Sequence, residues 1–212
     1  MAARSGMSKL ITQVRQLAAI GTADYTIIGA ATYWSDDQVQ DILDRTRVEI
    51  WDEPTAKVPL VNSGGTTEYR EYRVPFQWLE QTTGGTAVFY LRDATGKRIG
   101  TADYSVDYSS GRITFGANQQ GSVRYVTARS YDVYEAAATV WESKAAHVAD
   151  RIDFDADGAS FKASQMVAHY QRMAQQMRAR STTGGVTVGQ FRRNDVAIQT
   201  WDTGVRSTRV TF

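Results

Sequence analysis

The sequence predicts an α+β protein with four helices, an inserted antiparallel β domain and an extended C-terminal arm. Apolar residues recur with the period of a helix on both sides of residues 57–128, whereas within that stretch the period falls to two. Beyond residue 181 apolar residues are scattered among polar ones without a period. These changes divide the chain into four parts: N-terminal helices (residues 1–56), the β insertion (57–129), a helical hairpin (130–181) and the arm (182–212).

The first two helices are predicted from the spacing of their apolar residues and from their ends. Residues 8–20 carry apolar side chains at intervals of four and three, and a glycine follows as a stop signal. The second helix begins with a capping box, because Ser35 can accept from a free amide while Gln38 reaches back. Its apolar face is formed by residues 39–50, and the helix is expected to end at Pro54.

The β insertion is predicted from extended runs separated by turn residues. Three turns contain the Gly, Asn, Asp and Ser residues that tolerate a positive φ angle, at residues 62–65, 93–96 and 108–111. A compact antiparallel sheet or a small sandwich is therefore expected. Its candidate strands are residues 58–61, 68–74, 87–92, 104–107, 112–115 and 122–127.

The third and fourth helices are predicted at residues 130–151 and 159–181. The third is rich in alanine, which favours helix and permits close contact between helices. The fourth carries a stripe of side chains spaced for one face, which is typical of a core and, in a minority of proteins, of a peptide-binding groove. The stripe consists of Met166, Tyr170, Met173 and Met177.

Between these helices lies an acidic run, residues 153–158, that resembles the start of an EF-hand loop. It has carboxylates at positions 1, 3 and 5 and glycine at position 6, but position 12 is Ser164 instead of the bidentate Glu that calcium requires. We therefore predict a tight acidic turn that starts the fourth helix, with Ser160 or Asp157 as its cap. No metal site is expected here.

Composition narrows the class of protein and the chemistry available to it. The chain has 212 residues and no cysteine, which excludes disulfides, thiolate metal sites and a cysteine nucleophile. No apolar run is long enough to span a membrane, and the N-terminus lacks a signal pattern, so a soluble protein without a membrane partner is expected.

Charge is distributed unevenly along the chain. Residues 159–212 carry eight basic and two acidic groups, a balance of +6, which leaves −5 for residues 1–158 of a chain with net charge +1. This asymmetry indicates that the two ends meet different surroundings. The alternative is a set of solvated helix faces followed by a loose basic tail.

No catalytic, cofactor-binding or metal-binding residues are predicted, and the protein is not expected to be an enzyme. His147 and His169 have no Cys or Glu at ligand spacing, and the glycine pairs do not form a nucleotide-binding motif. The paired carboxylates lie where helix starts favour acidic residues. One alternative is a polysaccharide-binding or hydrolysing module that would use Trp78, Tyr90 and Tyr104 with Asp93 or Asp103.

Three segments carry a resemblance to a known family. They are residues 33–38 (Tyr-Trp-Ser-Asp-Asp-Gln) with residues 42–44, residues 131–138 (Tyr-Asp-Val-Tyr-Glu-Ala-Ala-Ala) and residues 153–165, which begin Asp-Phe-Asp-Ala-Asp-Gly. The chain resembles head-tail connector (adaptor) proteins of long-tailed bacteriophages and prophages. The resemblance covers the second to fourth helices and their order, and it is weaker in the β insertion and the arm.

The resemblance implies a structural virion protein at the head-tail interface, assembled in the host cytoplasm. Its helices would form a bundle, and its copies a homo-oligomeric ring, expected to be a dodecamer, beneath the portal protein. The ring would extend the channel through which double-stranded DNA passes without sequence recognition, and would contact a tail-side stopper or tail-terminator protein. Another virion ring protein, such as a hexameric tail-completion protein, is the alternative.

The arm has too few apolar residues to form a core, so it must dock on the body, dock on a partner or remain mobile. If the chain is an adaptor, the arm would dock on a neighbouring subunit or on the portal and add a strand to the partner's sheet. The residues predicted to bind a partner are Phe191, Arg192, Arg193, Trp201, Arg206, Arg209 and Phe212.

Overall fold

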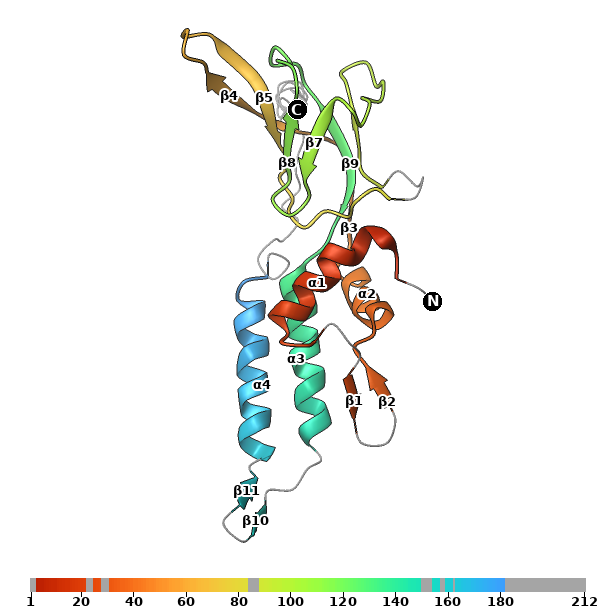
Figure 1. Cartoon of the computed structure of the whole chain (residues 1–212), viewed down its shortest axis with the longest axis vertical. Helices are drawn as coiled ribbons and strands as arrows, with labels where there is room; N and C mark the ends of the chain where they lie inside the picture. The colour runs from red at the N-terminus through yellow and green to blue at the C-terminus, as the bar shows by residue number, and fades with distance from the viewer. Residues whose placement is uncertain are drawn as a thin grey trace, which may run out of the picture. The chain divides into compact units, whose positions relative to one another are not determined.

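The computed structural model divides the chain into two units, Met1–Ser181 and Thr182–Phe212. The structure describes residues 3–21, 25–27, 31–83, 88–149, 154–156, 159–161 and 163–181, all of which belong to the first unit (Figure 1). Side chains are described in residues 3–21, 34–83, 88–149 and 163–181. The seven arm residues predicted to bind a partner lie outside the described residues.

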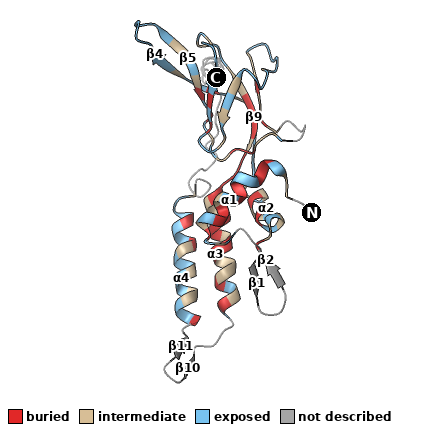
Figure 2. Cartoon of the chain, in the orientation of Figure 1, coloured by how far each residue is buried: buried red, intermediate tan, exposed pale blue. Residues whose placement is uncertain are grey.

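Four α-helices share one core. Trp141 belongs to this core, is 5% exposed and donates from Nε1 to the carbonyl oxygen of Leu17, at 3.2 Å. Met177 is buried in the same core, and Tyr170 and Met173 pack against it, so three of the four stripe residues belong to a core, whereas Met166 is not part of that cluster. Figure 2 shows that buried residues gather on α1 and α3. The helices are α1 (Ser8–Leu17), preceded by a 3₁₀ turn (Ser5–Met7), α2 (Asp36–Asp44), α3 (Val133–Ala149) and α4 (Ala163–Arg178).

Two antiparallel sheets share a second core, to which Tyr72, Phe89, Leu91 and Ile113 contribute fully buried side chains. One sheet has the strand order β3-β9-β6 and the other the order β4-β5-β8-β7. Their strands are β3 (Val48–Pro54), β4 (Ala56–Val61), β5 (Thr67–Arg73), β6 (Tyr90–Arg92), β7 (Tyr104–Asp107), β8 (Arg112–Phe115) and β9 (Tyr125–Ser130).

Two further hairpins complete the described strands. β1 (Tyr25–Ile27) pairs with β2 (Ala31–Tyr33), and β10 (Phe154–Ala156) pairs with β11 (Ala159–Phe161).

The expected α+β content is confirmed, but the expected helical bundle is wrong. The described residues contain eleven strands and only four α-helices, and α1 and α2 are just ten and nine residues long. The physical reason is that the chain leaves α2 at Asp44 and enters a sheet at Val48. β-branched Val48 and Ile50 satisfy a strand as well as a helix, and pairing with β9 decides between them.

The prediction that the acidic turn starts the fourth helix is wrong, because residues 154–156 and 159–161 pair with each other as a β-hairpin before that helix. Ser160, a proposed helix cap, pairs with Asp155 in the hairpin, and α4 begins only at Ala163. The sequence between the paired Ala156 and Ala159 is Asp-Gly, the dipeptide typical of two-residue hairpin loops. The proposed cap Asp157 and the side chains of the run lie outside the described residues.

Candidate assembly surface

One continuous stretch of chain forms the edge of both sheets. β3 and β4 are separated by the single residue Thr55, and each is the outermost strand of its own sheet. We call residues 48–61 the edge ribbon. It carries four of the five large apolar side chains that are exposed among the described residues, namely Val48 (41% exposed), Trp51 (69%), Leu60 (45%) and Val61 (71%). The ribbon therefore combines edge-strand backbone with exposed apolar surface.

A β-bulge lies next to Trp51, whose side chain is exposed. The pairing of β3 with β9 shifts register between Ile50, which is buried, and Glu53, and Asp52 adopts a φ of 45°. Asp52 is held in this left-handed conformation because its amide donates to Thr127 Oγ1 at 3.2 Å, and its carboxylate accepts from Arg92 at 3.0 Å. Bulges commonly redirect a side chain at functional sites, and a strained residue persists only where its surroundings hold it.

The other end of the ribbon leads into a hairpin turn that is closed by side-chain hydrogen bonds. Leu60 and Val61 precede a turn in which the side-chain oxygen of Asn62 accepts from the amides of Gly64 and Thr66, each at 3.0 Å. Gly65 supplies a φ of 75°. Because the turn satisfies its own backbone groups, the two apolar side chains are presented on an ordered support.

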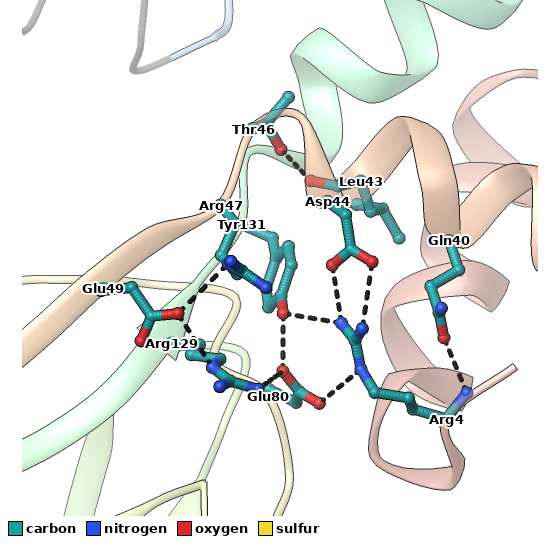
Figure 3. Close-up of polar contacts among 10 residues, drawn as sticks. All are labelled: Arg4, Gln40, Leu43, Asp44, Thr46, Arg47, Glu49, Glu80, Arg129 and Tyr131. Atoms are coloured by element: carbon teal, nitrogen blue, oxygen red, sulfur yellow. Dashed lines mark hydrogen bonds and ion pairs between the residues drawn. The ribbon is translucent and has the colours of Figure 1, made fainter.

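A polar junction fixes the start of the ribbon to the helices (Figure 3). Glu49 of β3 accepts from Arg129 of β9 at 3.1 Å and pairs with Arg47 at 3.2 Å. Arg129 lies 3.8 Å from the carboxylate of Glu80, which is 2% exposed and also accepts from the hydroxyl of Tyr131 at 2.6 Å. These contacts connect β3 and β9 with Tyr131, which lies two residues before the start of α3.

Arg4 completes the junction from the N-terminal side. Its guanidinium donates to both carboxylate oxygens of Asp44 at 3.0 and 2.6 Å, to Glu80 at 3.1 Å and to the Tyr131 hydroxyl at 3.1 Å (Figure 3). The hydrogen bond to Asp44 raises the pKa of Arg4, and burial, reinforced by Glu80, raises the pKa of Tyr131. Because its buried polar groups satisfy one another, the junction has the character of a structural network.

The aromatic residues of the polysaccharide alternative lie in different surroundings. Trp78 packs against the helical core, Tyr104 packs against the sheet core, and the ring of Tyr90 is covered by Arg98, whose guanidinium lies 3.9 Å from the ring centroid. Asp93 uses its carboxylate to close its own loop by accepting from Thr95 and Lys97. The structure therefore does not assemble the three aromatic rings into one stacking platform, although Asp93 and Asp103 line the same cavity, which none of the three rings lines.

Among the residues with described side chains, no three His, Asp or Glu groups lie close enough to hold a metal ion. The ring of His147 makes an edge contact with Trp34, and that of His169 with Trp141. In the described part of the chain, no helix is both long and apolar enough to cross a membrane.

Sequence reasoning predicted a strand at residues 58–61, within β4, but it missed β3 and the polar junction. Trp51 fell within the predicted second helix, and exposure at an edge follows from strand order, which depends on pairing between residues 48 and 130. The alternation of Val48 and Ile50 was the only available signal. No protein-family model matches the chain, and no curated protein matches it either.

Proposed function

We propose that the chain is a structural subunit of a phage virion, a head-tail adaptor that forms a ring beneath the portal and joins capsid to tail. The family assignment rests on the three resembling segments. The DNA channel and the tail-side partner are inferred from that family assignment alone. The observation that carries an assembly function is the edge ribbon, residues 48–61.

An exposed apolar edge is a hazard for a protein that works alone, because unpaired strand edges pair with other chains. The ribbon limits this hazard through Pro59, the bulge at Trp51 and Lys57, yet it keeps four exposed apolar side chains. This combination is typical of a surface that pairs with a selected partner. Tryptophan is also among the residues that contribute most to binding when buried at an interface.

The polar junction supports the same proposal, because it gives the ribbon a fixed base. Through Glu49, the start of β3 is connected to residues that contact Arg4 and Asp44. A subunit that transmits force between a capsid and a tail needs its contact surface held to its body. Buried polar networks with every member satisfied supply this rigidity.

The test is the mass of the assembled protein, measured by mass photometry and imaged by negative stain, alone and with its portal. We expect a ring of twelve copies that binds the portal. A six-membered ring would favour a tail-completion protein over an adaptor. A monomer that does not bind the portal would overturn the proposal.

A matched pair of variants tests the role of the ribbon. Leu60 and Val123 are each 45% exposed, but only Leu60 lies on the ribbon. We expect Leu60→Ser to weaken ring formation at an unchanged melting temperature, and Val123→Ser to leave the ring intact. Equal effects of the two substitutions would remove the ribbon from the interface.

A further inference from the structure

We infer that the edge ribbon of one copy is covered by the C-terminal arm, residues 182–212, of a second copy. This inference rests on the proposed ring and names the partner of its exposed surface. It is carried by three properties of the described ribbon and three properties of the arm sequence that match them.

The first match is between unpaired backbone and strand-forming sequence. β3 and β4 are outermost in their sheets, so their outer N–H and C=O groups have no strand partner among the described residues. Residues 204–212 read Gly-Val-Arg-Ser-Thr-Arg-Val-Thr-Phe, which are mostly β-branched or aromatic residues between polar ones. Such a segment gains main-chain hydrogen bonds by adding to an open edge. The bulge at Asp52 and Pro59 interrupt the ladder, so pairing is restricted to the regular stretches.

The second match is apolar. The ribbon exposes Trp51 and Val61 at 69% and 71%, and the arm carries Val205, Val210 and Phe212 without enough apolar residues to bury them itself. Contact between the two removes both surfaces from water, at about 25 cal/mol for each Å² of apolar area. Neither surface is explained by the fold of the described residues alone.

The third match concerns charge. Glu49 and Asp52 already pair with arginines, whereas Glu53 makes no ion pair with any described residue. Glu53 and the exposed ring of Trp51 lie on opposite sides of the bulge in β3, so each offers its own contact for a cation. An arginine suits both, since its guanidinium pairs with a carboxylate and stacks on an indole face. The arm supplies Arg206 and Arg209 within its strand-forming segment.

Length permits the arm to reach another copy. The arm has 31 residues after Ser181, and an extended chain spans about 3.3 Å per residue, so its maximal reach is on the order of 100 Å. This exceeds the dimensions of a domain of this size. A ring in which each arm covers the next ribbon uses two different surfaces of the same chain, as a head-to-tail contact requires.

Cross-linking of full-length protein tests the inference cleanly, because the chain has no cysteine of its own. A tagged Val48→Cys variant is co-expressed with an untagged Val210→Cys variant, and the pair is treated with a short bis-maleimide. Ser105→Cys serves as the matched control, because Ser105 is also exposed on an edge strand, β7 at the far side of the other sheet.

We expect a covalent dimer of one tagged and one untagged chain, joined between positions 48 and 210, at about ten times the yield of the Ser105 control, since docking raises the local thiol concentration. Adding Trp51→Ser to the tagged chain should lower that yield. Equal yields with the control would overturn the inference.

The mass of the same samples separates this inference from the proposed function. A ring of full mass without the 48–210 cross-link rejects the arm as the cover and leaves the ring in place. Absence of any ring rejects the proposed function, whereas the cross-link result still decides whether an arm reaches a second copy.

Discussion

Replacing Tyr131 by Phe tests whether the polar junction stabilises the fold. The hydroxyl of Tyr131 donates to Glu80 at 2.6 Å and accepts from Arg4 at 3.1 Å, and both Tyr131 and Glu80 are almost fully buried, at 3% and 2% exposed. The substitution keeps the ring and opens no cavity, so the effect comes from the polar contacts. It leaves a buried carboxylate without its shortest hydrogen bond.

A hydrogen bond to a charged group contributes about 1.5–3 kcal/mol, and we expect Tyr131→Phe to lower the free energy of unfolding by that amount. For a protein of this length, 1 kcal/mol shifts the melting temperature by about 2–4 °C, so the expected fall is roughly 3–12 °C. Differential scanning calorimetry and urea unfolding measure both quantities. Tyr134→Phe is the matched control, because the half-buried Tyr134 hydroxyl makes no hydrogen bond within the described residues.

The dependence on pH sharpens this test. Burial and Glu80 raise the pKa of Tyr131 in the folded protein above its unfolded value of about 10. The raised pKa therefore contributes stability below about pH 10, and that contribution is lost as the pH rises further. Tyr131→Phe should flatten the loss of stability above pH 10 relative to the parent. A variant that melts with the parent at neutral pH and follows the same alkaline profile would refute the reasoning.

Two further predictions concern the helical core and a sheet loop. Trp141→Ala should destabilise by about 3–5 kcal/mol, because it leaves a cavity in the core, and urea unfolding that matches the parent would contradict this burial. The hydroxyls of Ser109 and Ser110 lower the pKa of Asp107 to about 2, so its contribution to stability is present above about pH 4 and lost as the pH falls toward 2. Asp107→Asn should weaken the acid dependence in that window, and identical acid melting profiles would count against the assignment.

Local signals in the sequence predicted several elements well. The capping box at Ser35 is present. The backbone N–H of Gln38 donates to Ser35 Oγ, and the side-chain oxygen of Gln38 accepts from the backbone N–H of Ser35. Strands β7 and β8 occupy residues 104–107 and 112–115, as their alternation and the intervening Gly111 indicated. These elements are set by short-range chemistry: a cap, a period and a turn.

Elements decided by distant partners were not predictable in this way. β3 is a strand because it pairs with β9, some eighty residues later, and not because its own residues exclude a helix. That one error extended the second helix and concealed β3, the first strand of the edge ribbon. The polar junction was equally hidden, since Arg4, Glu80 and Tyr131 are separated by 76 and 51 residues.

The central claim, that residues 48–61 are covered on assembly, is tested most directly by amide hydrogen exchange of the ribbon in the assembled and unassembled protein. The unassembled state is supplied by dilution or by Leu60→Ser. We expect exchange in residues 48–61 to slow on assembly. Exchange in β7, which forms the edge opposite β4 in the four-stranded sheet, should stay unchanged. Equal exchange of the ribbon in the two states would contradict the account.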